Sequence, residues 1–215
     1  MTASKWVKSE SVVTDDDFVS NAATATATPR PGGPLRPRIE AVQKRLESHL
    51  ARLDSLQSDL KARDGETFRR LMAAIKESNA QYSTVLSAEL ARARQVSRVV
   101  ATARAALERI HVKLSSVSDF GDLVIVLAPA MAVVKNVRSS LTPCVPEMEQ
   151  ELGVISEMLS GILVDAGQVG GYTINFETAN EEAVRLVEEA ASAVEQKMKE
   201  EFPGIPDVPM VPKAA

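Results

Sequence analysis

The hydrophobic positions in the first part of the chain recur with the spacing of a coiled-coil helix. From Pro37 onward, apolar residues are separated by alternating steps of three and four, with His49 filling one position. We call this row the first seam; it comprises Ile39, Val42, Leu46, His49, Leu53, Leu56 and Leu60. Asp64-Gly65, within "ARDGET", then predicts a tight turn that ends this helix.

A second row of the same spacing follows. Its members are Tyr82, Leu86, Glu89, Ala93, Val96, Val100, Ala103, Leu107, Ile110, Leu114 and Val117. Because no Pro or Gly lies between Gly65 and Gly121, about 50 residues can form one helix, on the order of 75 Å long. A short connection between two such helices predicts an antiparallel hairpin. The second helix is predicted to be the longer, so later helices or another copy must cover its far half.

Three shorter helices are predicted after the hairpin. They cover roughly residues 121–140, with a kink or boundary near Pro129, then 147–166 and 177–202. The last helix is acidic, and its apolar stripe is thin: Val184, Val187, Ala191, Val194 and Met198. No segment of convincing length has strand periodicity. The predicted fold class is therefore all-α, a long antiparallel hairpin plus three shorter helices.

Composition divides the chain into five parts. The predicted parts are a disordered leader (1–34), a helical core (35–167), a linker (168–176), an acidic regulatory helix (177–202) and a proline-rich tail (203–215). The leader contains "NAATATATPRPGG", which has too little apolar surface to offset the entropy of ordering. Near its start, Trp6 and Val7 lie between lysines. They predict either a short arm that inserts into a membrane surface or a plain disordered segment.

The net charge of −4 conceals a strong division along the chain. Residues 30–113 hold 17 basic and 9 acidic residues, net +8, whereas residues 114–215 hold 6 basic and 16 acidic residues, net −10. The predicted basic face comprises Arg69, Arg70, Arg92, Arg94, Arg98, Arg104 and Arg109. Such a stripe can bind lipid headgroups or nucleic acid, contact other subunits, or only aid solubility. Nucleic acid is the weaker choice because few aromatic residues are available to stack on bases.

The sequence offers little for catalysis or for spanning a membrane. It contains two histidines and one cysteine, Cys144, and no phosphate-binding glycine loop or Cys/His spacing typical of metal sites. We therefore expect no enzyme activity, cofactor, metal or small-molecule substrate. The apolar run at 123–134 is 12 residues long and contains Pro129, whereas a spanning helix needs about 20 residues.

The tail "FPGIPDVPMVP" has prolines at 203, 206, 209 and 212, every third residue. This spacing favours polyproline II, a stiff conformation in which the prolines share one edge and docking costs little entropy. The alternative is a proline tail that binds nothing.

The order of these parts resembles the ESCRT-III family, and most closely the archaeal CdvB group. The resemblance is carried by "RIEAVQKRLESHLARLDSLQSDLKARD", "LERIHVKLSSVSDFGDLVIVLAPAMAVVKNVRSSL", "EMEQELGVISEMLSGILVDAG" and the tail "FPGIPDVP". Because the sequence ends at Ala215, it looks like a shorter paralogue. We expect it to lack the winged-helix segment with which the full-length member recruits CdvA.

The resemblance implies a membrane-associated, polymer-forming subunit of a cell-division machinery that constricts or cuts membranes. Its implied partners are itself and its paralogues, an anionic membrane, and the MIT domain of a CdvC-like AAA ATPase. The implied MIT-binding residues are Phe202, Pro203, Ile205, Pro206, Val208 and Pro209.

The resemblance also implies a closed state in which the acidic helix folds back onto the basic hairpin and prevents polymerisation. The implied autoinhibitory residues are Glu181, Glu182, Glu188, Glu189 and Glu195. The expected location is cytoplasmic, peripheral to the membrane and at the division site. The alternatives are a phage-shock-protein-A-like membrane coat, a coiled-coil scaffold without an ATPase partner, or a nucleic-acid-binding helical protein.

Overall fold

The computed structural model describes residues 34–117, 120–170 and 175–206, and this part of the chain is all-helical. The helices are α1 (Leu35–Lys76), α2 (Ala80–Ser115), α3 (Phe120–Leu141), α4 (Glu149–Gly170) and α5 (Phe176–Glu201), with a 3₁₀ turn, η1 (Pro146–Met148), before α4. The predicted fold class, a long hairpin followed by three shorter helices, is confirmed.

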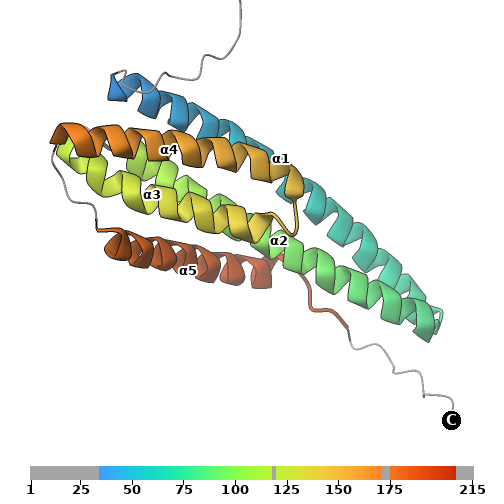
Figure 1. Cartoon of the computed structure of the whole chain (residues 1–215). Coiled ribbons are helices and arrows are strands. Elements are labelled where there is room, and N and C mark those ends of the chain that lie inside the picture. The colour runs from blue at the N-terminus through green and yellow to red at the C-terminus, as the bar shows by residue number, and fades with distance from the viewer. Residues whose placement is uncertain (1–33, 118–119, 171–174, 207–215) are drawn as a thin grey trace, which may run out of the picture.

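The hairpin of α1 and α2 is the frame on which the other helices pack (Figure 1). α3 lies along α2, α4 bridges α1 and α3, and α5 lies across α2 and α3 on the other side of the bundle. All three shorter helices cover the same end of the hairpin, and its turn end projects beyond them. The fold thus has two regions: a proximal bundle of five helices and a distal two-helix hairpin.

The proximal bundle contains the main core. Its fully buried large side chains come from four helices, so the core is one continuous cluster rather than a two-helix seam. They include Leu46 and Leu53 from α1, Leu107 and Ile110 from α2, Leu127 from α3, and Leu152 and Leu159 from α4. α5 adds mainly alanines to this cluster.

The predicted turn at Asp64-Gly65 is wrong. α1 continues through both residues, and the chain reverses at Glu77–Asn79, where Ser78 has φ 58°. Asn79 caps α2 by accepting a hydrogen bond from the backbone N–H of Tyr82 (3.1 Å). Gly65 is exposed on α1, and an added Cβ would contact nothing within 4 Å, so the helix has no steric need for glycine at this position. Asp64 is tolerated because an arginine of α2 pairs with it.

The later turn also corrects the predicted mismatch in helix length. α1 has 42 residues and α2 has 36, so the second helix is the shorter of the two. The expectation of a second helix of about 50 residues, longer than the first, is therefore wrong. The expectation that later helices of the same chain cover its far half holds, because α3 and α5 pack on α2. The difference in helix length can no longer serve as an argument for assembly.

In the distal half of the second seam, alternate positions are displaced by one residue. Leu90 and Ser97 are buried in place of Glu89 and Val96, and Tyr82 is 46% exposed, whereas Leu86 is buried as predicted. From Val100 onward the predicted and observed rows coincide. Both rows keep a spacing of three and four, so spacing alone does not decide which of two neighbouring residues faces α1.

The boundaries of the shorter helices are close to those predicted. α3 runs through Pro129, and α4 extends to Gly170, three residues into the predicted linker. Within the described residues, no helix is both long enough and apolar enough to cross a membrane. The leader, including Trp6 and Val7, lies outside the described residues.

Candidate interaction surface

The acidic helix α5 is a distinct element that packs on α2 and α3. Asn175 begins it by accepting hydrogen bonds from the backbone N–H groups of Glu177 (3.1 Å) and Thr178 (3.3 Å). Its buried stripe is Ala179, Ala183, Ala190 and Val194, with Leu186 and Val187 half-buried. Val184, which was expected in this stripe, is 47% exposed. Small side chains give a close but shallow contact, which favours a helix that can be released.

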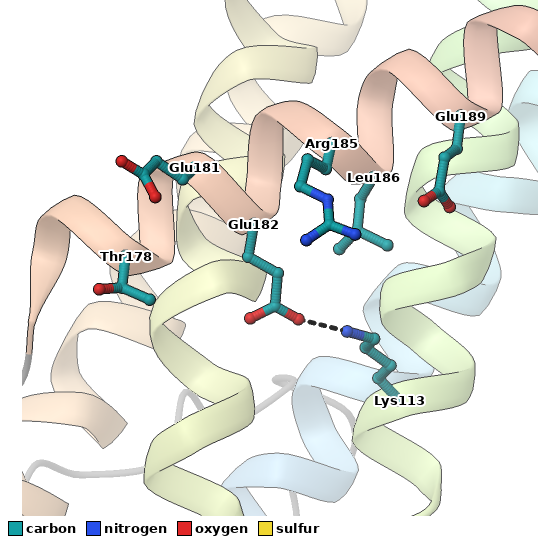
Figure 2. A pocket seen from close by; sticks show the side chains of 7 residues that line it. All are labelled: Lys113, Thr178, Glu181, Glu182, Arg185, Leu186 and Glu189. Carbon is teal, nitrogen blue, oxygen red and sulfur yellow. Dashed lines mark hydrogen bonds and ion pairs between the residues drawn. The ribbon is translucent and has the colours of Figure 1, made fainter.

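Two ion pairs add to this contact. Lys113 of α2 donates to Glu182 at 2.5 Å (Figure 2). One turn earlier on α2, Arg109 donates to the carbonyl of Leu186 at 2.9 Å and lies 3.4 Å from the carboxylate of Glu189. These pairs are partly exposed, so each contributes at most about 1 kcal/mol.

An open hollow of about 360 Å³ lies between α5 and the end of α2, around the Lys113–Glu182 pair. Its lining residues are Lys113, Thr178, Glu181, Glu182, Arg185, Leu186 and Glu189. The described residues contain no group of three side chains suited to hold a metal ion. The hollow is the open side of the contact between α5 and α2.

The five glutamates predicted to be autoinhibitory occupy different positions on α5. Glu182 and Glu189 contact α2, and Glu181 lines the hollow. Glu188 is exposed, and Glu195 pairs with Lys199 along the same helix at 3.4 Å. The contact to the hairpin thus runs through two of the five, and the autoinhibitory role stays a prediction.

The seven arginines of the predicted basic face also fall into two groups. Arg69, Arg70, Arg92 and Arg98 are exposed. Arg94, Arg104 and Arg109 are bound within the molecule: Arg94 to Asp64, Arg104 to Asp54 and Glu108, and Arg109 to α5. Arg69 and Arg70 lie on α1 rather than near the start of the second helix, and they contact the carbonyl of Gly65 and the carboxylate of Glu66 there. The predicted membrane or polymer surface is not tested by these contacts. In this conformation the four exposed arginines are the most accessible to a partner.

The proline-bearing tail begins on the hairpin. Phe202 ends α5, and the carbonyl of Pro203 accepts a hydrogen bond from Arg94 at 2.6 Å. Ile205 packs against the distal cluster of the hairpin, and Pro206 is half-buried. Val208 and Pro209, the remaining residues of the predicted MIT-binding motif, lie outside the described residues.

His49 of the first seam is buried between α1 and α4, with 1% of its surface exposed. Its Nδ1 lies 3.1 Å from the carboxylate of Glu151, whereas Nε2 has no hydrogen-bond partner among the described residues. Burial, and secondarily the charge of Arg52, lowers the pKa of His49 from 6.5 to about 4. His49 thus lies buried in the first seam, where its spacing in the sequence places it.

Sequence reasoning missed two buried ion pairs that fix the hairpin and α4. Arg94 holds Asp64 across the hairpin, and Arg38, only 5% exposed, holds Asp165 of α4. Gly161 leaves room for the Arg38 guanidinium, since an added Cβ would lie 3.0 Å from it. The sequence contains a signal for the Arg94–Asp64 pair, because Asp64 lies four residues after Leu60 and so continues the first seam. The turn chemistry of Asp64-Gly65 conceals this signal.

Comparison with known proteins finds curated relatives that are named as cell-division proteins. Cell division protein B1 of Sulfolobus acidocaldarius is 32% identical over 178 residues, which are 83% of each chain. Cell division protein B of the same organism is 25% identical over 175 residues, 81% of this chain and 67% of the relative. No family model matches the sequence, and no solved structure matches it.

These alignments extend over most of the chain, and both relatives are named as cell-division proteins. They also support the prediction that the chain is not an enzyme. With its all-helical hairpin and three shorter helices, the chain belongs to the CdvB-type family of archaeal cell-division proteins.

Proposed function

We propose that this cell-division protein is a subunit of a membrane-associated polymer and that the conformation described is its closed, unassembled state. The observation that carries the proposal is the docking of acidic α5 on α2 and α3 through a shallow alanine stripe and two partly exposed ion pairs. A contact of this kind is stable within one chain and can be released without unfolding the core.

Release of α5 uncovers a face that extends over α2 and α3. The uncovered groups are Lys113, Arg109 and the apolar surface beneath Ala183 and Ala190. Neighbouring copies or paralogues pack on this face, and the polymer lies on an anionic membrane through exposed arginines such as Arg92 and Arg98.

A AAA ATPase with an MIT domain then binds the proline-bearing tail and remodels the polymer. The support is the residue pattern of Phe202, Pro203, Ile205 and Pro206, together with their position at the end of a releasable helix. An element with this connection transmits a pull on the tail directly to α5. The proposed location is the cytoplasmic surface of the membrane at the division site.

Three comparisons test this proposal. Sedimentation with anionic and neutral vesicles, beside DNA at the same salt concentration, should show binding that requires acidic lipid; binding to DNA alone would contradict it. Removal of residues 177–215 should increase light scattering through assembly. Truncation after Glu201 should abolish binding to an isolated MIT domain while assembly persists, and an unchanged affinity would favour a coat or scaffold without an ATPase.

A further inference from the structure

The tail packs on an apolar surface between the two helices of the distal hairpin, which we call the groove. The buried residues there are Leu71 and Ala74 of α1 and Leu86 and Leu90 of α2. Phe68, Ile75 and the tail residue Ile205 pack against this cluster as partly buried side chains. Two helices alone bury little apolar surface. Among the described residues, Ile205 adds apolar cover to this cluster that α3, α4 and α5 do not supply.

Arg94 connects this groove to the tail backbone. Its Nε and Nη2 donate to the two carboxylate oxygens of Asp64 at 2.7 and 3.2 Å, and its Nη1 donates to the carbonyl of Pro203 at 2.6 Å. The guanidinium carbon lies 5.9 Å from the ring centre of Phe68 and 5.4 Å from that of Phe202. The Arg94 guanidinium therefore pairs with a carboxylate through two hydrogen bonds, donates to a backbone carbonyl and lies against two aromatic rings at the same time. A lysine ammonium cannot make this combination of contacts.

The pairing with Asp64 fixes Arg94 in place before the tail binds. The side chains of Asp64 and Arg94 are only 7% and 13% exposed, so the two opposite charges compensate each other where little water reaches them. The remaining N–H groups of Arg94 then point in a fixed direction. An additional pair, Lys61 with Glu201 at 3.2 Å, holds the end of α5 over the same part of α1.

We propose that the groove organised by Asp64, Phe68 and Arg94 is a binding site for the segment Phe202–Pro206, and that it competes with the ATPase for this segment. The competition rests on the proposed function, because it assumes that the tail is the MIT ligand. The groove itself rests only on contacts within the chain. While Ile205 is packed on the hairpin and the Pro203 carbonyl is bonded to Arg94, a second protein can bind these residues only after the tail has left the groove.

The chain then has two separate attachments for its C-terminal part. Lys113 and Arg109 hold the middle of α5 on the proximal bundle, whereas Arg94 holds the tail on the distal hairpin. The affinity of a partner for the tail falls by the fraction of molecules in which the tail is free. Loss of the Arg94 contact should therefore raise MIT affinity by about three- to tenfold, even with α5 in place.

The test uses the full-length chain with Cys144→Ser and spin labels at Gly204→Cys and Ala88→Cys. Gly204 suits a label because nothing lies within 4 Å of an added Cβ, and Ala88 is exposed on α2. The label-to-label distance should be a single narrow distribution. In Arg94→Gln combined with Asp64→Asn, which leaves no unpaired buried charge, it should broaden and lengthen. Glu89→Gln, at an exposed position of the same helix, should leave it narrow.

Each variant is then titrated with the isolated MIT domain. Arg94→Lys serves as a second variant that keeps the charge opposite Asp64 if the double variant folds poorly. A narrow distance in both Arg94 variants would overturn the binding groove. A broadened distance with unchanged MIT affinity would overturn the competition. A broadened distance with no MIT binding by any variant would support the groove and contradict the proposed ATPase contact.

Discussion

The proximal and distal parts of the hairpin consist of the same two helices but are stabilised differently. In the proximal part, α3, α4 and α5 surround α1 and α2, and residues such as Leu107 and Leu159 are completely buried. In the distal part, two helices share a cluster of four buried residues, and the only further cover among the described residues is the tail segment with Ile205.

This difference indicates which parts of the molecule can rearrange. The proximal core holds several helices together and resists change, whereas the distal hairpin has only the tail segment as additional cover, and this segment is the one that the proposed partner would bind. The same tail is thus a structural layer in one state and a proposed ligand in the other. The predictions below compare the two regions, from the largest expected effect to the smallest.

Leu107→Ala should have the largest effect, because Leu107 is fully buried in the five-helix core. We expect the free energy of unfolding to fall by about 4 kcal/mol, measured by chemical denaturation. A loss below about 1 kcal/mol would mean that the proximal core is much looser than the packing of α2 against α3 and α5 indicates.

Leu90→Ala, the matched change in the distal cluster, should cost less. We expect about 2 kcal/mol, because a cavity beside two helices and a short tail can relax more easily. Amide hydrogen exchange should accelerate around the distal turn while the amides of α3 and α4 stay protected. Equal acceleration in both regions would show that the hairpin behaves as one cooperative unit.

Sequence reasoning was accurate for the proximal part and failed in the distal part, for a physical reason. Leu46, Leu53, Leu107 and Ile110 gave a clear seam, and four-helix burial enforces it. In the distal part, Asp64-Gly65 has the local chemistry of a turn, and only the pairing of Asp64 with Arg94 keeps the helix intact. Contacts between residues 30 positions apart, or between Arg94 and the tail, leave no mark on local periodicity.

The free energy of unfolding should vary with pH mainly through His49 in the proximal bundle. Its folded-state pKa of about 4 lies below the unfolded value of 6.5, so the unfolded chain takes up a proton first as the pH falls. Stability from the neutral imidazole is complete above pH 6.5 and is lost as the pH falls toward 4. The slope should reach about 1.4 kcal/mol per pH unit, and His49→Gln should reduce it. An unchanged slope in that variant would assign the effect to other groups.

Gly65→Ala should give the smallest effect and a stabilising one. Gly65 lies inside α1 with open space around it, so alanine should raise the free energy of unfolding by about 0.5–1 kcal/mol. Thermal unfolding of both chains measures this. A destabilised variant would support a turn at Asp64-Gly65 and contradict the continuous helix.

The central claim is that α5 holds the chain in a closed state through its contacts with α2. The most direct measurement is light scattering of the chain with Glu182→Lys and Glu189→Lys, which place like charges opposite Lys113 and Arg109 and leave the proposed assembly face on α2 unchanged. The account predicts that this chain assembles at concentrations where the unmodified chain stays unassembled. Glu188→Lys with Glu195→Lys, at exposed positions of the same helix, should leave the chain unassembled. If the chain with Glu182→Lys and Glu189→Lys scatters no more than the unmodified chain, the claim is contradicted.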